Sequence, residues 1–220
     1  MKVLITGGSR GIGKATAQKF REEGYEVYTP TRQELDLADD NSVEKYVKNN
    51  KNINFDVIIN NAGINDINEL ENVTDIEIEN MFQVNLLGPI KLLRGLVGGM
   101  KQNHYGRIIN IGSIWAVVSK EGRSIYSATK NGIHGITNAL AIELAPYGVL
   151  VNTVCPGFTL TELTKKNNSD EAITSISKGI PVGRMAEPKE IAETIYFLGS
   201  NFNTYITGQK IVVDGGYSIK

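Results

Sequence analysis

Cysteine, histidine and long apolar runs are scarce in this sequence, and each scarcity excludes a class of protein. Cys155 is the only cysteine, so no internal disulfide can form, and its apolar neighbours predict a buried core thiol. The two histidines, His104 and His134, lie near no arrangement of carboxylates or cysteines that suggests a metal site. We therefore treat both histidines as structural and expect no bound metal.

An excess of charge of one sign is also missing. The chain carries 23 Lys and Arg against 24 Asp and Glu, a formal net charge of -1, which predicts no surface for nucleic acid or an anionic membrane. No run approaches the ~20 apolar residues of a membrane span, and the apolar stretch within Met1–Gly7 is too short for a signal peptide. We expect a cytoplasmic protein without nucleic-acid or membrane partners.

What the sequence does contain is an alternation of short β-branched runs with longer segments of helical period. This pattern predicts an α/β fold: a Rossmann-type, doubly wound parallel sheet with helices on both faces. The 220 residues suit a single domain over 1–220, large enough to bury roughly 70% of its unfolded surface. Strands are predicted near Lys2–Thr6, Glu26–Thr29, Glu34–Asp36, Asp56–Asn60, Arg107–Gly112, Val149–Val154 and Lys210–Val213. Helices are predicted near Gly11–Glu23, Asn41–Asn49, Thr74–Asn103, Tyr126–Ala145 and Pro188–Gly199.

One polar stretch, Lys165–Asp170, has no predicted secondary structure. It follows the carboxyl end of a predicted strand, where open α/β sheets bind their ligands. The stretch is therefore either a solvated loop or part of a substrate lid.

A glycine-rich loop joins the first predicted strand to the first predicted helix. Glycines at this junction allow a tight turn and close approach of a ligand, and the helix N-terminus attracts phosphate oxygens. The spacing departs from the common G-x-G-x-x-G pattern because position 16 is Thr. A glycine-rich turn without a phosphate is the alternative. The predicted pyrophosphate loop comprises Gly7, Ser9, Arg10, Gly11, Ile12 and Gly13.

The end of the second predicted strand indicates which dinucleotide binds. An NAD site usually places a carboxylate there to hold the ribose 2′-OH, and none occurs in 28–32. Arg32 instead offers a fork suited to a 2′-phosphate, and Arg10 can approach the same group from the glycine loop. This favours NADP(H), although either arginine alone is more often a solvated surface charge.

Tyr126 and Lys130 are candidates for proton transfer. Reduction of a ketone by hydride requires a proton for the developing alkoxide, and an unperturbed tyrosine releases its proton poorly at pH 7. Lys130 follows four residues later on the same helix face, where its charge favours the phenolate. Ser113 follows a predicted strand and can hold the substrate oxygen. Each residue also has an ordinary structural interpretation, but together they indicate a carbonyl reductase.

The order of these motifs along nearly the whole chain resembles the short-chain dehydrogenase/reductase family, and most closely its 3-oxoacyl-carrier-protein reductases. The resemblance implies that Asn85 completes the catalytic set through a water relay to Lys130, and that Tyr126 and Lys130 also contact the cofactor. It further implies that Asp36 and Leu37 contact the adenine. The motifs that carry the resemblance are the 6–13 loop, Asn60–Gly63, Asn85, Ser113, Tyr126 with Lys130, Pro156–Gly157, Ile180–Arg184, Tyr205–Gln209 and Val213–Gly216. Further cofactor contacts implied by the resemblance are Asn61, Ala62 and Gly63 at the ribose, and Pro156, Gly157, Thr159 and Thr161 at the nicotinamide.

The predicted activity is therefore NADP(H)-dependent interconversion of a ketone or aldehyde and an alcohol. A 3-oxoacyl thioester is one candidate substrate, but His104 with Tyr105 and Tyr147 occupy places where carrier-protein reductases tend to have arginines. A sugar or other small metabolite remains an alternative, with Trp115 and Phe158 as pocket walls. A non-catalytic cofactor sensor and a nucleotide-sugar epimerase or dehydratase are less consistent with the motifs present.

We also expect a homotetramer. The predicted helices at 74–103 and 126–145 carry more apolar positions than one sheet face can cover. The family resemblance implies that both helices pack between subunits, and that the last strand with 215–217 forms a second interface.

Overall fold

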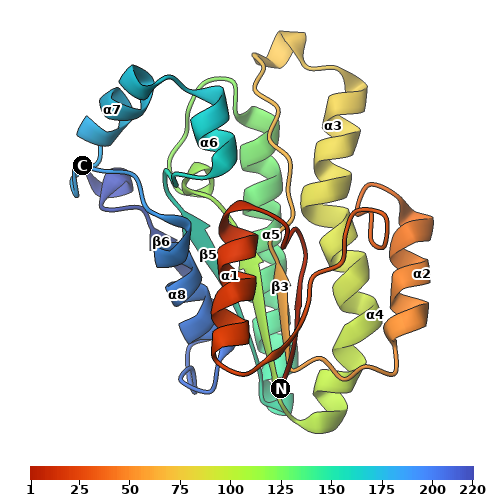
Figure 1. Cartoon of the computed structure of the whole chain (residues 1–220). Helices are drawn as coiled ribbons and strands as arrows, with labels where there is room; N and C mark the ends of the chain where they lie inside the picture. The colour runs from red at the N-terminus through yellow and green to blue at the C-terminus, as the bar shows by residue number, and fades with distance from the viewer.

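In the computed structural model of this chain, six parallel strands form one sheet in the order β2-β1-β3-β4-β5-β6 (Figure 1). The structure describes the backbone throughout and the side chains of all residues except Leu163 and Asn167. The α/β doubly wound sheet predicted from the sequence is confirmed. The strands are β1 (Lys2–Ile5), β2 (Glu26–Tyr28), β3 (Val57–Asn60), β4 (Gly106–Ile111), β5 (Val149–Pro156) and β6 (Lys210–Val213).

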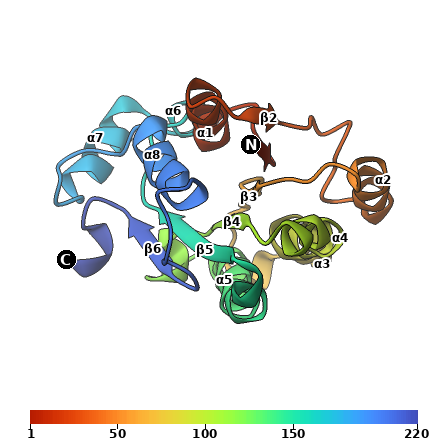
Figure 2. The same cartoon turned by 90° about the horizontal axis from the view of Figure 1, so that it is seen from below.

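Helices cover both faces of the sheet (Figure 2). Helices α1 and α8 pack against each other on one face, whereas α2, α4 and α5 cover the other. No helix among the described residues is long and apolar enough to cross a bilayer. The α-helices are α1 (Gly11–Glu22), α2 (Asp40–Asn50), α3 (Asp75–Phe82), α4 (Gly88–Asn103), α5 (Ser124–Leu144), α6 (Glu162–Asn167), α7 (Asp170–Lys178) and α8 (Pro188–Gly199).

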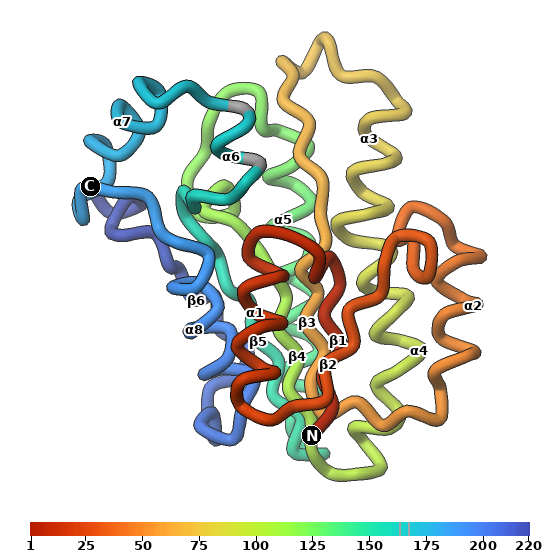
Figure 3. Tube along the Cα trace, viewed as in Figure 1, coloured from red at the N-terminus to blue at the C-terminus, as the bar shows by residue number. Residues whose placement is uncertain are grey.

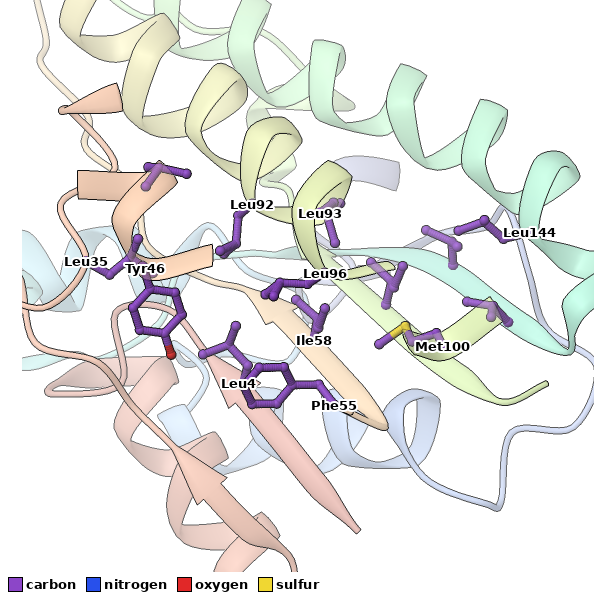
Figure 4. Packing of buried hydrophobic residues seen from close by; sticks show 14 of the residues in the cluster. Leu4, Leu35, Tyr46, Phe55, Ile58, Leu92, Leu93, Leu96, Met100 and Leu144 are labelled. Carbon is purple, nitrogen blue, oxygen red and sulfur yellow. The ribbon is translucent and has the colours of Figure 1, made fainter. Parts of the chain in front are cut away.

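The strands bury apolar side chains on both faces because successive residues of a strand point to opposite sides. In β3, Ile58 joins the cluster beneath α2, α4 and α5, and its neighbours Val57 and Ile59 join the cluster beneath α1 and α8. Figure 4 shows the first cluster, where Ile58 and Leu4 face Leu96 of α4. Cys155 is buried, as its apolar neighbours predict.

The strand predicted at Glu34–Asp36 is wrong. This stretch forms turns, because the side chain of Glu34 accepts hydrogen bonds from the backbone N–H and the hydroxyl of Thr31 at 2.8 and 2.9 Å. The alternation of Leu35 and Leu37 imitates a strand, but both leucines pack into the core from a loop. Consequently β2 is the edge of the sheet.

The single helix predicted over Thr74–Asn103 is interrupted. A five-residue π-helical segment, Gln83–Leu87, separates α3 from α4. The local cause is Pro89, which has no N–H to bond to the carbonyl of Asn85 four residues earlier. The N–H of Gly88 bonds to the carbonyl of Gln83, five residues back, and the π turn results.

The polar stretch 165–170 is more ordered than the sequence indicates. It contains the end of α6 and the start of α7, and the hydroxyl of Ser169 caps α7 by accepting from the N–H of Ala172. Asn167 lies in this stretch, and its side chain is outside the described part of the chain. In Figure 3 both helices project from the sheet beyond β5.

Candidate active site

The residues singled out in the sequence gather at the carboxyl ends of the strands. The chain runs outward from β1 to β2 and then returns to β3 on the other side of β1, so the strand order reverses between β1 and β3. Open α/β sheets bind ligands in the crevice at such a reversal. The glycine loop follows β1 at this position, and residues 61–63 follow β3.

The glycine loop leaves room for a ligand and tolerates no larger residues. Gly7 has a φ of 67°, and a Cβ there would lie 2.9 Å from the Cα of Ala62. Asn61 donates from its side chain to the carbonyl oxygens of Thr6 and Gly7 at 2.9 and 3.1 Å. The loop is therefore held in shape by the chain itself.

The N-terminus of α1 has free capacity for an anion. Its preceding residue, Arg10, forms no side-chain cap, and the first turn contains no acidic residue. The first N–H groups of a helix lack backbone partners, and the helix dipole is positive there. Ser9 and Arg10 are exposed beside this end, and Ile12 is partly buried. This is the geometry expected of a pyrophosphate site.

Thr6 ties the two loops together and was not singled out in the sequence as a site residue. Its hydroxyl accepts hydrogen bonds from the backbone N–H groups of Asn61 and Ala62 at 3.0 and 3.1 Å. A buried Thr at the end of a first strand is too common to be recognised from sequence alone. The adjacent Gly63 faces the catalytic candidates, since a Cβ there would lie 3.1 Å from Asn85 Oδ1 and 3.4 Å from Lys130 Nζ.

Ser113, Tyr126 and Lys130 come together as predicted. Ser113 follows β4 directly, its hydroxyl accepts from the N–H of Trp115 at 3.2 Å, and it lies close enough to the Tyr126 phenol to lower the pKa of that group. Lys130 lies one turn further along α5, with Nζ 5.6 Å from the centre of the Tyr126 ring. The ammonium donates to the carbonyl oxygen of Ile111 at 2.8 Å.

Burial dominates the proton affinities of this cluster. It raises the pKa of Tyr126, and the hydrogen bond with Ser113 and the charge of Arg123 act in the opposite direction. Burial also lowers the pKa of Lys130 to about 8. The lowering of the Tyr126 pKa expected from Lys130 is therefore not found, because the buried ammonium is directed at the Ile111 carbonyl and is itself desolvated.

Asn85 lies in the π segment, and its side chain points away from its own helix. Its Oδ1 accepts from the N–H of Ile64 at 2.8 Å, and its Nδ2 donates to the Ile64 carbonyl at 2.9 Å and to the Thr129 hydroxyl at 3.2 Å. Thr129 directly precedes Lys130 on α5. The segment thus brings Asn85 to the catalytic helix.

The two arginines predicted at the 2′-phosphate lie on the surface. Arg32 is 82% exposed and forms an ion pair with Asp36, with Nε 2.9 Å from Oδ2. Asp36 Oδ1 accepts from the N–H of Ala38 at 3.0 Å, whereas Leu37 is buried in the core. The Asp36 carboxylate therefore competes with any phosphate that binds for the Arg32 guanidinium.

The remaining cofactor candidates follow β5. Thr159 donates from its hydroxyl to the carbonyl of Gly157 at 3.2 Å, and Thr161 caps α6. A Cβ on Gly11 would lie 3.2 Å from Cγ2 of Thr161, so this segment faces the glycine loop. Gly157, next to Pro156, lies against Asp214, and no side chain larger than hydrogen fits there.

An aromatic cluster lies next to Ser113. The rings of Trp115 and Phe158 pack edge to face with their centres 5.9 Å apart, and Tyr217 joins them at 5.1 Å from Phe158. The sequence indicated Trp115 and Phe158, but not Tyr217, which is far from both in the chain. Arg123, with its Cζ 5.9 Å from the centre of the Trp115 ring, was also missed. The sequence signal that could have identified Arg123 is its position three residues, or one helical turn, before Tyr126.

Comparison with known proteins gives consistent results. The family described as "Enoyl-(Acyl carrier protein) reductase" matches residues 28–218. The chain is 36% identical over 233 residues to the 3-oxoacyl-[acyl-carrier-protein] reductase FabG of Vibrio harveyi, covering 97% of this chain and 95% of that protein. A solved "short chain dehydrogenase/reductase family protein" has a TM-score of 0.92 at 30% identity, with 100% and 98% coverage. The structure "ElxO with NADP Bound" has a TM-score of 0.91 at 31% identity, with 98% of both chains covered.

Proposed function

We propose that this chain, which belongs to the short-chain dehydrogenase/reductase family of oxidoreductases, interconverts a ketone or aldehyde and an alcohol with NADP(H). The observation that carries the proposal is the cluster of Ser113, Tyr126 and Lys130 at the carboxyl end of β4. A hydroxyl and a phenol that lie next to each other can hold one oxygen atom of a substrate and deliver a proton to it.

The residues at the strand reversal suit a dinucleotide. The loops at Gly7, Gly11 and Gly63 pack so closely against neighbouring residues that an added Cβ would crowd them, and the uncapped start of α1 offers N–H groups to a pyrophosphate. The solved relative with NADP bound supports the choice of cofactor, as does the absence of a carboxylate in 28–32. When bound, the nicotinamide would supply or accept the hydride.

The chain's own residues would manage the proton. Ser113 holds the substrate oxygen, and Tyr126 donates its phenolic proton as charge develops on that oxygen. Lys130 lies one turn further along α5, and we assign to it the binding of the cofactor rather than a change in the pKa of Tyr126. Asn85 and Thr129 hold the neighbouring backbone, so these groups are placed before the substrate arrives. Burial of the cluster strengthens each of these interactions.

The test is NADPH oxidation measured with a panel of carbonyl compounds. The panel contains a 3-oxoacyl thioester, a keto sugar, a small ketone and, as a matched control, an enoyl thioester. Turnover of at least one carbonyl compound and none of the enoyl thioester supports the proposal. Reduction of the enoyl thioester alone contradicts it, because the proton would then go to carbon.

A 3-oxoacyl thioester is the first substrate to try, since the FabG relative is named for it. The free thioester and the carrier-bound form need separate measurement. At the end of α4, His104 lies beside Tyr147 with the ring centres 6.2 Å apart, and Lys101 covers the Tyr147 ring. Among the described residues, Lys101 is the one cation that lies over these two rings, so we expect no gain from an acidic carrier protein. A sugar remains the alternative substrate.

A second copy of the chain is the proposed partner, in a homotetramer. Ile142 of α5 is 80% exposed and Leu87 is 41% exposed at the start of α4, which leaves apolar side chains in water on the outer helical face. Near the β6 edge, Tyr205 and Ile219 are also exposed. Light scattering at micromolar concentration tests this, and a monomer would contradict it. Ile142→Asp should disrupt one of the two interfaces.

A further inference from the structure

Arg123 directly precedes α5 and is unusual among the charged residues of the described structure. Its Nε and Nη1 atoms are shielded from solvent and have no hydrogen-bond partner among the described residues. Buried donors without partners destabilise a fold, and a guanidinium keeps its charge in proteins. These two atoms are closed off by the chain itself, whereas Nη2 is not among the shielded atoms and stays open to a group from outside the described chain.

No carboxylate of the described residues lies within ion-pair distance of Arg123. None of the ion pairs among the described residues involves it, and the first turn of α5 contains no acidic residue. Glu121, the nearest acidic residue along the chain, is exposed. The start of α5 adds the positive end of a long helix to the charge of the guanidinium. An anion is the ligand that this position favours.

Arg123 also lies at the catalytic cluster. It precedes Tyr126 by three residues, which is one helical turn, and its charge opposes the effect of burial on the Tyr126 phenol. On the other side its guanidinium lies over Trp115, which belongs to the aromatic cluster with Phe158. A ligand atom held by Arg123 is thus within a short carbon chain of an oxygen held by Ser113 and Tyr126.

We infer that Arg123 determines specificity by binding a carboxylate of the substrate, so that the compound reduced is an oxo acid and the alcohol formed is a hydroxy acid. This inference rests on the proposed function and narrows its substrate class. The open Nη2 offers N–H donors and a positive charge to a carboxylate oxygen, which gives a charge-assisted hydrogen bond. The aromatic side chains of Trp115 and Phe158 suit the short carbon chain next to it.

The experiment compares each oxo acid with its primary amide, which has the same shape and no charge. Acids with the ketone at carbon 2, 3 or 4 are tested by NADPH oxidation in wild type, Arg123→Gln and Arg123→Lys. The wild-type enzyme should have a kcat/KM for the preferred acid at least thirtyfold higher than for the corresponding amide. Arg123→Gln should lower kcat/KM for the acid at least tenfold more than for the amide, and the difference in Arg123→Lys should be smaller. Arg21→Gln, a change of an exposed arginine on α1, should have no effect.

Equal kcat/KM for acid and amide in wild type would overturn the inference, as would an equal loss for both in Arg123→Gln. The first outcome would show that the enzyme has no preference for the acid over the amide. The second would show that Arg123 stabilises only the fold or the Tyr126 phenol. In either case a neutral carbonyl compound would still be reduced, so the proposed function would stand.

A binding measurement tests the anion site at Arg123 independently of the proposed reductase activity. Trp115 is the only tryptophan and lies next to Arg123, so its fluorescence reports on ligands there. Butanoate, added with NADP⁺, should change the emission of wild type but not of Arg123→Gln, and butanamide should change neither. If butanoate binds in this way while no carbonyl compound is reduced, the anion site stands and the proposed function fails. If butanoate has no effect on wild type, the anion site is overturned.

Discussion

The two ends of the proposed site are built in different ways. At the catalytic end, Lys130 and Asn85 are buried and hydrogen-bonded to backbone groups, Lys130 to the end of β4 and Asn85 to the loop at Ile64. At the end that would select the cofactor, Arg10 and Arg32 lie on the surface, and Arg32 pairs with Asp36. Buried contacts hold a side chain in one position, whereas an exposed ion pair contributes little and can rearrange. The catalytic end is thus preorganised, and the cofactor end is adjustable.

The largest effect is expected from Tyr126→Phe, which removes the transferable proton and leaves the packing almost unchanged. The rate should fall by about 10²–10⁴, the usual contribution of a positioned acid. NADPH affinity, measured by protein fluorescence, should remain within a few-fold. A variant that keeps a tenth or more of the wild-type kcat would show that Tyr126 is not the acid.

The second prediction concerns Lys130 and the pH dependence of stability. Because the folded chain holds Lys130 at a pKa of about 8 instead of 10.5, the unfolded chain binds more protons between these values. The buried charge therefore destabilises the fold below pH 8 by about 3 kcal/mol, and this cost disappears as the pH rises toward 10.5. Lys130→Met removes the cost but also the hydrogen bond to Ile111, worth about 1 kcal/mol.

Urea unfolding at several pH values measures this effect. Lys130→Met should be more stable than wild type at pH 7, and the difference should shrink toward pH 10. Lys48→Met, a change of an exposed lysine on α2, should show no such trend. A difference that stays constant with pH would mean that Lys130 is not desolvated in the folded chain.

At the cofactor end, Arg32→Ala should have a smaller effect. We expect the wild type to prefer NADPH to NADH at least tenfold in kcat/KM, which corresponds to about 1.4 kcal/mol. Arg32→Ala should raise KM for NADPH and leave KM for NADH nearly unchanged, since only NADPH has the 2′-phosphate. Thr31→Asp should shift the preference toward NADH by repelling that phosphate.

Arg21→Ala serves as the control for lost surface charge. Equal kcat/KM values for the two cofactors in wild type would show that neither Arg32 nor Arg10 selects the phosphate.

The smallest effect is expected from Asp36→Asn, which tests whether the cofactor end is adjustable. Loss of the carboxylate frees Arg32 from its ion pair, while an Asn oxygen can still accept from Ala38. NADPH preference should rise by about threefold, since exposed pairs contribute 0.2–1 kcal/mol. The gain should vanish at high salt, where surface charges are screened. An equal fall in kcat/KM for NADPH and NADH would indicate instead that Asp36 contacts the adenine, which both cofactors share.

Local patterns in the sequence determined much of this molecule. The alternation of strands and helices predicted the sheet, because apolar periodicity directly reflects which faces are buried. The four-residue spacing of Tyr126 and Lys130 placed both on one helix face, and Ser113 followed from the end of a strand. The same reasoning failed at Glu34–Asp36, since two leucines that pack from a loop show the alternation of a strand.

Only the tertiary structure decided the contacts between distant segments. Asn85 reaches α5 because it lies in a π turn. The local cause of this turn, Pro89, is visible in the sequence, but the contact of Asn85 with Thr129 is not. The pKa of Tyr126 depends on burial, which no single segment specifies. In the sequence Arg123 resembles an ordinary surface charge, but the fold places it over Trp115 without an ion pair to any described carboxylate. Desolvation and unpaired donors arise from packing, so the folded chain alone reveals them.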